Sequence, residues 1–252
     1  FFQYYKLAIR NARKDGAATI LLQTIAGIAI LLLAPFLPFK FPHDLRVYAL
    51  LTIACIFYAL NDRLNTTSRK HIEVSVFSII SQLSNVFLIL IGIAVFREPL
   101  VTTKLIGAGL ILVSNIFLFY KQGGFQINKY VWLGILATLV YAIALSVDIG
   151  ISKQFNLPFY IMLTLLLPAV MIYYGEKIKL KEITQEYTGK NKKYYLITGI
   201  TWALAIFFSL RSFQLGKITT IVPLQATAVL LNVAVAYFFF HEKKGRLKKF
   251  LA

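Results

Sequence analysis

Cysteine is almost missing from this sequence of 252 residues. The one cysteine, Cys55, lies within an apolar run, so the chain cannot build a disulfide framework or a cysteine-based metal site. The three histidines are scattered and show no His-x-x-x-His spacing. Nucleophile elbows, Walker loops and glycine-rich dinucleotide loops are also absent. The sequence therefore predicts no enzyme, no metal site and no cofactor.

Acidic residues are scarce, and charged residues of either sign are few. Ten Asp and Glu stand against 27 Lys and Arg, which gives a formal net charge of +17. The basic residues form short clusters between apolar runs rather than an aromatic-interleaved patch, so we expect them to face anionic lipid and not nucleic acid. With 58% hydrophobic residues and a mean hydropathy of +0.71, the chain is too apolar for one soluble core. The expected partner is a lipid bilayer.

Long apolar runs dominate what is present. A bilayer core of roughly 30 Å requires about 20 mainly apolar residues per helix. Runs of this length without strict alternation indicate helices rather than barrel strands. Eight spans are predicted: Ala17–Leu37, Tyr48–Leu64, Val74–Phe96, Val101–Tyr120, Tyr130–Ile151, Leu157–Gly175, Tyr194–Phe213 and Ile218–Phe240.

The two ends resemble parts of further helices. Phe1–Ile9 has the composition of the tail of an earlier helix, and a new apolar segment begins at Leu247. We therefore expect a fragment, cut at both ends, of a protein with about ten helices. The longest connection, Glu176–Lys193, is rich in lysine and is predicted to be a solvated, mobile loop.

An internal repeat organises the spans. A shift of 144 positions superimposes Val95-Phe96-Arg97-Glu98 on Phe239-Phe240-His241-Glu242 without a gap. The order of helix lengths around this match also repeats, as five helices followed by five more. An odd number of spans per repeat inserts the two halves with opposite orientations, an arrangement found in transporters whose site lies between the halves.

The same residues carry a family resemblance. Ser78-Ile79-Ile80-Ser81-Gln82 through Glu98-Pro99-Leu100, followed by Lys104 and the glycines Gly107 and Gly109, resembles the end of an EamA-type repeat. Val222-Pro223-Leu224 through Glu242 resembles the same ending. The resemblance to the drug/metabolite transporter superfamily implies an all-α, polytopic transmembrane bundle of two inverted five-helix repeats. We expect these repeats at residues 1–122 and 130–252.

Basic residues also predict an orientation. Most Lys and Arg follow the odd-numbered spans, when the Phe1–Ile9 segment is counted as the first, and six lysines lie between Lys177 and Lys193. The positive-inside rule places these loops in the cytoplasm. The resembled family generally has both termini inside, which implies the reverse, and we follow the charge. The expected location is the cytoplasmic (inner) membrane.

Asp148 is the clearest functional candidate, because a charge at membrane depth costs about 2.5–3.5 kcal/mol on insertion scales. It lies amid apolar turns in the first helix of the second half. A buried carboxylate there can bind a proton or a cationic substrate. The alternative is a structural pair with Arg211 or Lys153 from a neighbouring segment. The residues do not separate these two hypotheses.

Other polar residues are weaker candidates for a solute or ion pathway. Asn61-Asp62-Arg63 ends a short apolar run, so an interfacial stop competes with a place near the mouth of a pore. Arg211 is either an interface anchor or a ligand for an anionic group. Amides on two matched helices either line a cavity or bond helix to helix; they are Gln82, Asn85, Gln225 and Asn232.

Mid-helix aromatic residues and two helix-end glutamates complete the set. Tyr141 and Trp202 lie where they could stack on a substrate, whereas Glu98 and Glu242 are expected to cap helices or fasten turns. The predicted function is transport of a small metabolite or drug-like solute by alternating access, with or without proton coupling. A non-transporting scaffold or sensor is the alternative. The substrate, coupling ion, direction of transport and oligomeric state are left open.

Overall fold

A computed structural model describes residues 2–10, 12–72, 74–98, 128–187 and 191–226, with a few positions between 106 and 113. Throughout these residues the regular structure is helical, and no strand occurs among them. Five of the described helices are long and apolar enough to cross a membrane. The predicted all-α, polytopic class is therefore confirmed.

The helices follow the predicted spans closely. Their bounds are α1 Phe2–Ile9, α2 Asp15–Leu31, η1 Ala34–Phe36, α3 Leu45–His71, α4 Val74–Ala94, α6 Lys129–Ile151, η2 Ser152–Gln154, α7 Leu157–Gly175, α8 Leu180–Tyr187, α9 Lys192–Leu215 and α10 Ile218–Ala226. Most of the predicted span Val101–Tyr120, and the part of Ile218–Phe240 beyond Ala226, lie outside the described residues.

Two expectations about helix extent are wrong. α3 does not end at Leu64 but continues for two further turns to His71, because the polar side chains of its last turns find hydrogen-bond partners on neighbouring elements. The segment Glu176–Lys193 is not simply a loop, since it contains α8. The carboxylates of Glu182 and Glu186 fasten α8 to the segment that precedes α2.

The 144-residue repeat is also seen in the positions where the helices begin and end. After that shift, the end of α2 falls on Gly175, the end of α3 on Leu215 and the start of α4 on Ile218, which are bounds of α7, α9 and α10. Matched helices also run in opposite directions. Asn156, which caps the start of α7, lies beside the residues that follow α2, whereas Glu176 at the end of α7 lies beside Gly16. The halves are therefore inverted, while the repeat limits 1–122 and 130–252 stay a prediction.

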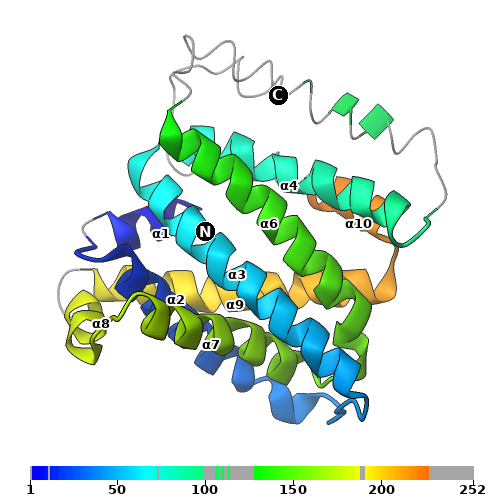
Figure 1. Ribbon diagram of the computed structural model, residues 1–252, viewed down its shortest axis with the longest axis horizontal. Coiled ribbons are helices and arrows are strands. Elements are labelled where there is room, and N and C mark those ends of the chain that lie inside the picture. The colour runs from blue at the N-terminus through cyan, green and yellow to red at the C-terminus, as the bar shows by residue number, and fades with distance from the viewer. Residues whose placement is uncertain are drawn as a thin grey trace.

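The halves interlock around one core. α3 packs along α6, α2 packs between α7 and α9, and α4 packs on α6 and α10 (Figure 1). Small residues allow close approach: a Cβ at Gly27 would lie 3.0 Å from Leu166 of α7, and one at Gly199 would lie 2.5 Å from Ile25 of α2. This arrangement brings the middle of α3 against the second half.

Candidate ion and solute site between the halves

Asp148 lies inside the bundle, where three helices from both halves meet. Its side chain is 1% exposed. One carboxylate oxygen accepts a hydrogen bond from the hydroxyl of Tyr58 on α3 at 2.7 Å, and the other accepts one from Tyr160 on α7 at 2.6 Å. Asp148 itself comes from α6. The first half thus supplies one hydroxyl and the second half supplies the carboxylate and the other hydroxyl.

No cation neutralises this carboxylate among the described residues. Both proposed structural partners lie elsewhere: Arg211 is exposed and donates to Gln214, and Lys153 is exposed. The alternative of a structural ion pair with either residue therefore has no support among the described contacts. Two neutral hydroxyls satisfy the carboxylate only in part, and a buried charge without a counter-charge is costly. The site is consequently suited to take up a positive charge, either a proton or a cationic group.

Aromatic rings surround the carboxylate. Tyr141 of α6 lies edge-on to Tyr58 with 6.3 Å between ring centroids, and Phe155 lies against Tyr160 at 4.9 Å. The Tyr141 hydroxyl is within electrostatic range of both Asp148 and Asp62. Tyr141, a candidate from the sequence, therefore belongs to this site.

A line of polar side chains runs from Asp148 along α3. We call Tyr58, Asp62, Thr66 and Lys70 the α3 polar stripe. They are four residues apart, so they share one helix face with about one turn between neighbours. Each makes a polar contact with another helix or with the segment before α2. The stripe connects the middle of the bundle to one end.

Asp62 and Thr66 occupy the buried middle of the stripe. The Asp62 carboxylate accepts hydrogen bonds from the amides of Gln23 on α2, at 2.6 Å, and of its neighbour Asn61, at 2.8 Å. Thr66 bonds to the hydroxyls of Tyr5 at 3.0 Å and Thr19 at 2.8 Å. Since Asp62 and Asn61 are buried well before the end of α3, the interfacial-stop interpretation is wrong for both.

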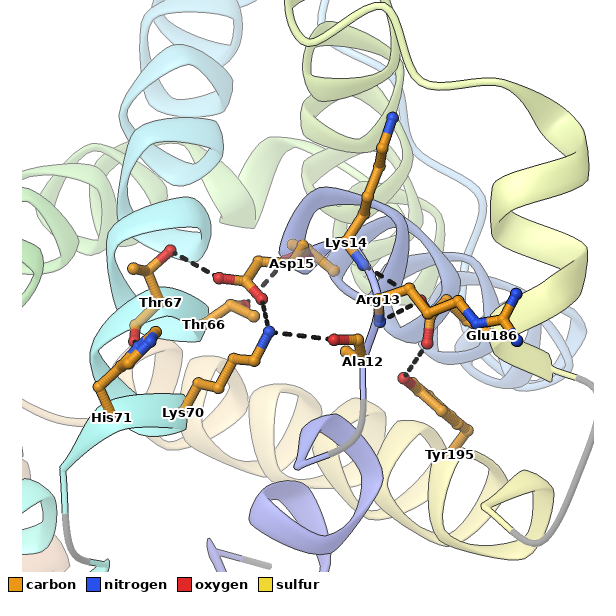
Figure 2. Close-up of polar contacts among 11 residues, drawn as sticks. Ala12, Arg13, Lys14, Asp15, Thr66, Thr67, Lys70, His71, Glu186 and Tyr195 are labelled. Atoms are coloured by element: carbon orange, nitrogen blue, oxygen red, sulfur yellow. Dashed lines mark hydrogen bonds and ion pairs between the residues drawn. The ribbon is translucent and has the colours of Figure 1, made fainter.

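The outer end of the stripe is fixed by ionic contacts. Lys70 pairs with Asp15 at 2.7 Å and donates to the carbonyl oxygen of Ala12 at 3.0 Å (Figure 2). Thr67, beside it in the same view, donates to Asp15 at 3.3 Å. Arg63 faces the second half, where it pairs with Glu176.

α8 fastens this end from the second half. The buried carboxylate of Glu186 accepts from the backbone N–H groups of Arg13, at 2.7 Å, and Lys14, at 3.2 Å, and Figure 2 shows it between them and Tyr195. The Lys14 ammonium binds Glu182 at 2.6 Å. A hydrogen bond from Lys14, together with the N–H of Lys179, lowers the pKa of the Glu182 carboxyl.

At the opposite end, Glu98 has the role expected of it. Its carboxylate accepts from the backbone N–H groups of Ile218, at 2.8 Å, and Thr219, at 2.9 Å, and so caps α10. The capping prediction for Glu98 is thus confirmed, while Glu242 lies outside the described residues.

The remaining sequence candidates do not gather at Asp148. Gln82 and Asn85 bond to each other on α4 at 2.6 Å. Gln225 donates to the hydroxyls of Ser209 and Ser212, so it joins α10 to α9. Trp202 is half-buried, and its ring lies 6.4 Å from that of Tyr5. Asn232 lies outside the described residues.

Sequence reasoning missed several residues of the site, among them Tyr58, Tyr160, Gln23, Thr66 and Lys70. The spacing of the α3 polar stripe was the available signal, but it extends past Leu64, where hydropathy alone ends the span. Within the described part of the chain, no group of three or more His, Cys, Asp or Glu side chains is placed to hold a metal ion.

Apolar spans, inverted halves and a carboxylate buried between them define a multi-pass helical membrane protein of the transporter class. The comparison with families names that class: residues 5–120 match the EamA-like transporter family. Over these residues the sequence is similar to that family.

A solved structure supports the fold. One protein of known crystal structure is 17% identical, has a TM-score of 0.60, and aligns over 98% of this chain and 91% of its own. At that identity the likeness concerns the fold alone. No curated protein matches the sequence.

Proposed function

We propose that the protein moves a small metabolite or drug-like solute across the cytoplasmic membrane by alternating access, and that Asp148 takes up and releases a positive charge during the cycle. The observation that carries this proposal is the contact of Asp148 with Tyr58 of the first half and Tyr160 of the second. The charge it takes up is a proton or a cationic group of the solute.

A change in the charge of Asp148 is suited to alter how the two halves pack against each other. The ionised carboxylate accepts from both hydroxyls and so holds α3 against α6 and α7. Once Asp148 is protonated or bound to a cation, its oxygens have less need of these donors, and the Tyr58 contact between the halves weakens. A change of charge is thereby linked to a change in the preferred arrangement of the halves.

A non-transporting scaffold or sensor is the alternative. It does not require a carboxylate without a counter-ion where the two halves meet, because an apolar contact there would be less costly. Substrate binding and gradient-driven uptake therefore separate the two hypotheses.

Proteoliposomes that contain the full-length protein provide the test. Uptake of a labelled solute library is measured with and without a proton gradient, for wild type and Asp148→Asn. We expect the variant to lose gradient-driven uptake; it should keep substrate exchange if the charge is a proton and lose exchange as well if the charge belongs to the solute. Asp44→Asn is the matched control, because Asp44 is an exposed helix cap and asparagine caps equally well. Full gradient-driven uptake by Asp148→Asn would refute the role of Asp148.

A further inference from the structure

A second buried carboxylate lies one turn along α3 from the Tyr58 contact. We call Asp62, Asn61 and Gln23 the amide–carboxylate cluster. Their exposed fractions are 6%, 4% and 0%, although all three are polar and lie within predicted membrane spans. Polar groups in such a place are costly and require an explanation.

Hydrogen bonding within the cluster leaves an excess of acceptors. Each carboxylate oxygen of Asp62 receives one amide N–H, from Gln23 or from Asn61. The amide oxygens, Gln23 Oε1 and Asn61 Oδ1, are buried and have no hydrogen-bond partner. Two amide oxygens and one carboxylate thus lie together with too few donors, and unsatisfied buried acceptors are destabilising.

Neighbouring cations do not remove this excess. Asp62 forms no ion pair within the described residues, and Arg63, next to it in sequence, pairs with Glu176. Arg69 attracts Asp62 through space, but its guanidinium is bonded to Asn65 and lies over the rings of Tyr5 and Phe77 at 4.6 and 4.1 Å. None of these contacts places a cation on the Asp62 carboxylate.

We propose that the amide–carboxylate cluster binds one dehydrated monovalent cation, either an inorganic ion of the Na⁺ type or the ammonium group of a solute. Terminal amide torsions are broad and roughly two-fold, so turning either amide exchanges its N–H for its carbonyl oxygen. Turned amides would present two carbonyl oxygens beside the carboxylate. Carboxylate and carbonyl oxygens are the ligands that hard cations prefer, and an ammonium group donates to the same atoms.

This site would make Asp62 a coupling residue distinct from Asp148, and in that respect the inference rests on the proposed function. The two carboxylates are near neighbours along α3, because Tyr58, which donates to Asp148, lies one turn from Asp62. A cation at Asp62 therefore disfavours a second positive charge at Asp148, because like charges repel strongly in a medium of low dielectric constant. Binding itself is measurable without transport.

Thermal unfolding of the full-length protein in lipid nanodiscs tests the proposal. NaCl, KCl or methylammonium chloride is titrated against N-methyl-D-glucamine chloride at constant ionic strength. A ligand that binds only the folded state raises the Tm in a saturable way. We expect a saturable rise with at least one of the small cations. A response to Na⁺ or K⁺ identifies an inorganic ion, and a response to methylammonium alone identifies a solute ammonium group.

Variants assign the response to the cluster. Asp62→Asn should abolish it. Asn61→Leu and Gln23→Met each remove one orphaned oxygen, and each should weaken the apparent affinity by about tenfold or more. These two variants keep the test valid if Asp62→Asn does not fold. Gln214→Met is the matched control, because Gln214 is an amide at the other end of the bundle, and its titration should equal that of wild type.

Absence of a saturable response to every cation in wild type would overturn the proposal, as would an unchanged response in both Asn61→Leu and Gln23→Met. Either result leaves the proposed function intact if Asp148→Asn still loses gradient-driven uptake. Cation binding at the cluster, combined with undiminished uptake by Asp148→Asn, would instead refute the role of Asp148 alone.

Discussion

Asn156 joins the two halves at the end of the bundle opposite α8, and its removal provides a quantitative test of the fold. Its side-chain oxygen caps α7 by accepting from Phe159 N–H at 3.1 Å. Its amide N–H₂ lies within 3.1–3.3 Å of three carbonyl oxygens in the segment after α2, those of Ala34, Leu37 and Pro38. The side chain is 1% exposed, so water does not readily replace these contacts.

The expected cost of Asn156→Ala has two parts. Loss of a helix cap costs about 1 kcal/mol. Leaving buried carbonyl oxygens without a donor costs about 1–3 kcal/mol more. Asn128, which caps α6 through Tyr130 and Val131, is exposed and makes only the capping contacts, so Asn128→Ala should cost about 1 kcal/mol. The two alanine variants therefore differ by the contribution of the contact between halves.

Equilibrium unfolding of the purified variants, or their Tm in one detergent, measures this difference. Asn156→Asp adds a control, because aspartate keeps the cap but cannot donate to the carbonyl oxygens. We expect Asn156→Asp to be destabilised at least as much as the uncapped Asn128→Ala. Equal stability of Asn156→Ala and Asn128→Ala would show that the contact between halves contributes nothing, and the reasoning would fail.

Two further predictions concern packing and orientation. Gly199→Ala should destabilise the contact of α9 with α2 by about 1–3 kcal/mol, because its Cβ would lie 2.5 Å from the stiff side chain of Ile25. Gly150→Ala is the control: its Cβ meets nothing within 4 Å among the described residues, so its Tm should not fall. A reporter inserted in the Glu176–Lys193 segment should be cytoplasmic because of its six lysines. A periplasmic signal there would contradict the orientation drawn from charge.

Hydropathy was sufficient to predict the framework, because the bilayer fixes the length of apolar helices. The predicted span Leu157–Gly175 has the same bounds as α7. Hydropathy failed to predict the end of a helix where polar side chains are buried and hydrogen-bonded inside the protein. Thr66 and Ser68 lower the hydropathy of α3, yet both are buried and hydrogen-bonded, so the helix continues through them.

The partners of Asp148 could not be predicted for a related reason. A carboxylate amid apolar turns indicates a buried charge, but nothing in the sequence says whether a cation or two hydroxyls will face it. Tyr58 and Tyr160 have the composition of ordinary membrane aromatics, and only the crossing of α3, α6 and α7 brings their hydroxyls to one carboxylate. Long-range pairing of this kind depends on tertiary geometry, which local patterns do not encode.

The two halves share an arrangement of helices, but the side chains at matched positions differ in polarity. A shift of 144 residues carries the α3 polar stripe onto α9 at Trp202, Ile206, Leu210 and Gln214, of which only Gln214, at the very end, is strongly polar. A buried carboxylate, Asp62, therefore lies on one of the two matched helices and has no counterpart on the other. An inverted repeat with symmetric chemistry would favour neither side of the membrane. Within the described residues, the polar contacts of the α3 stripe lead from Asp148 to the end of the bundle that carries α8, so the two ends of the bundle differ in chemistry.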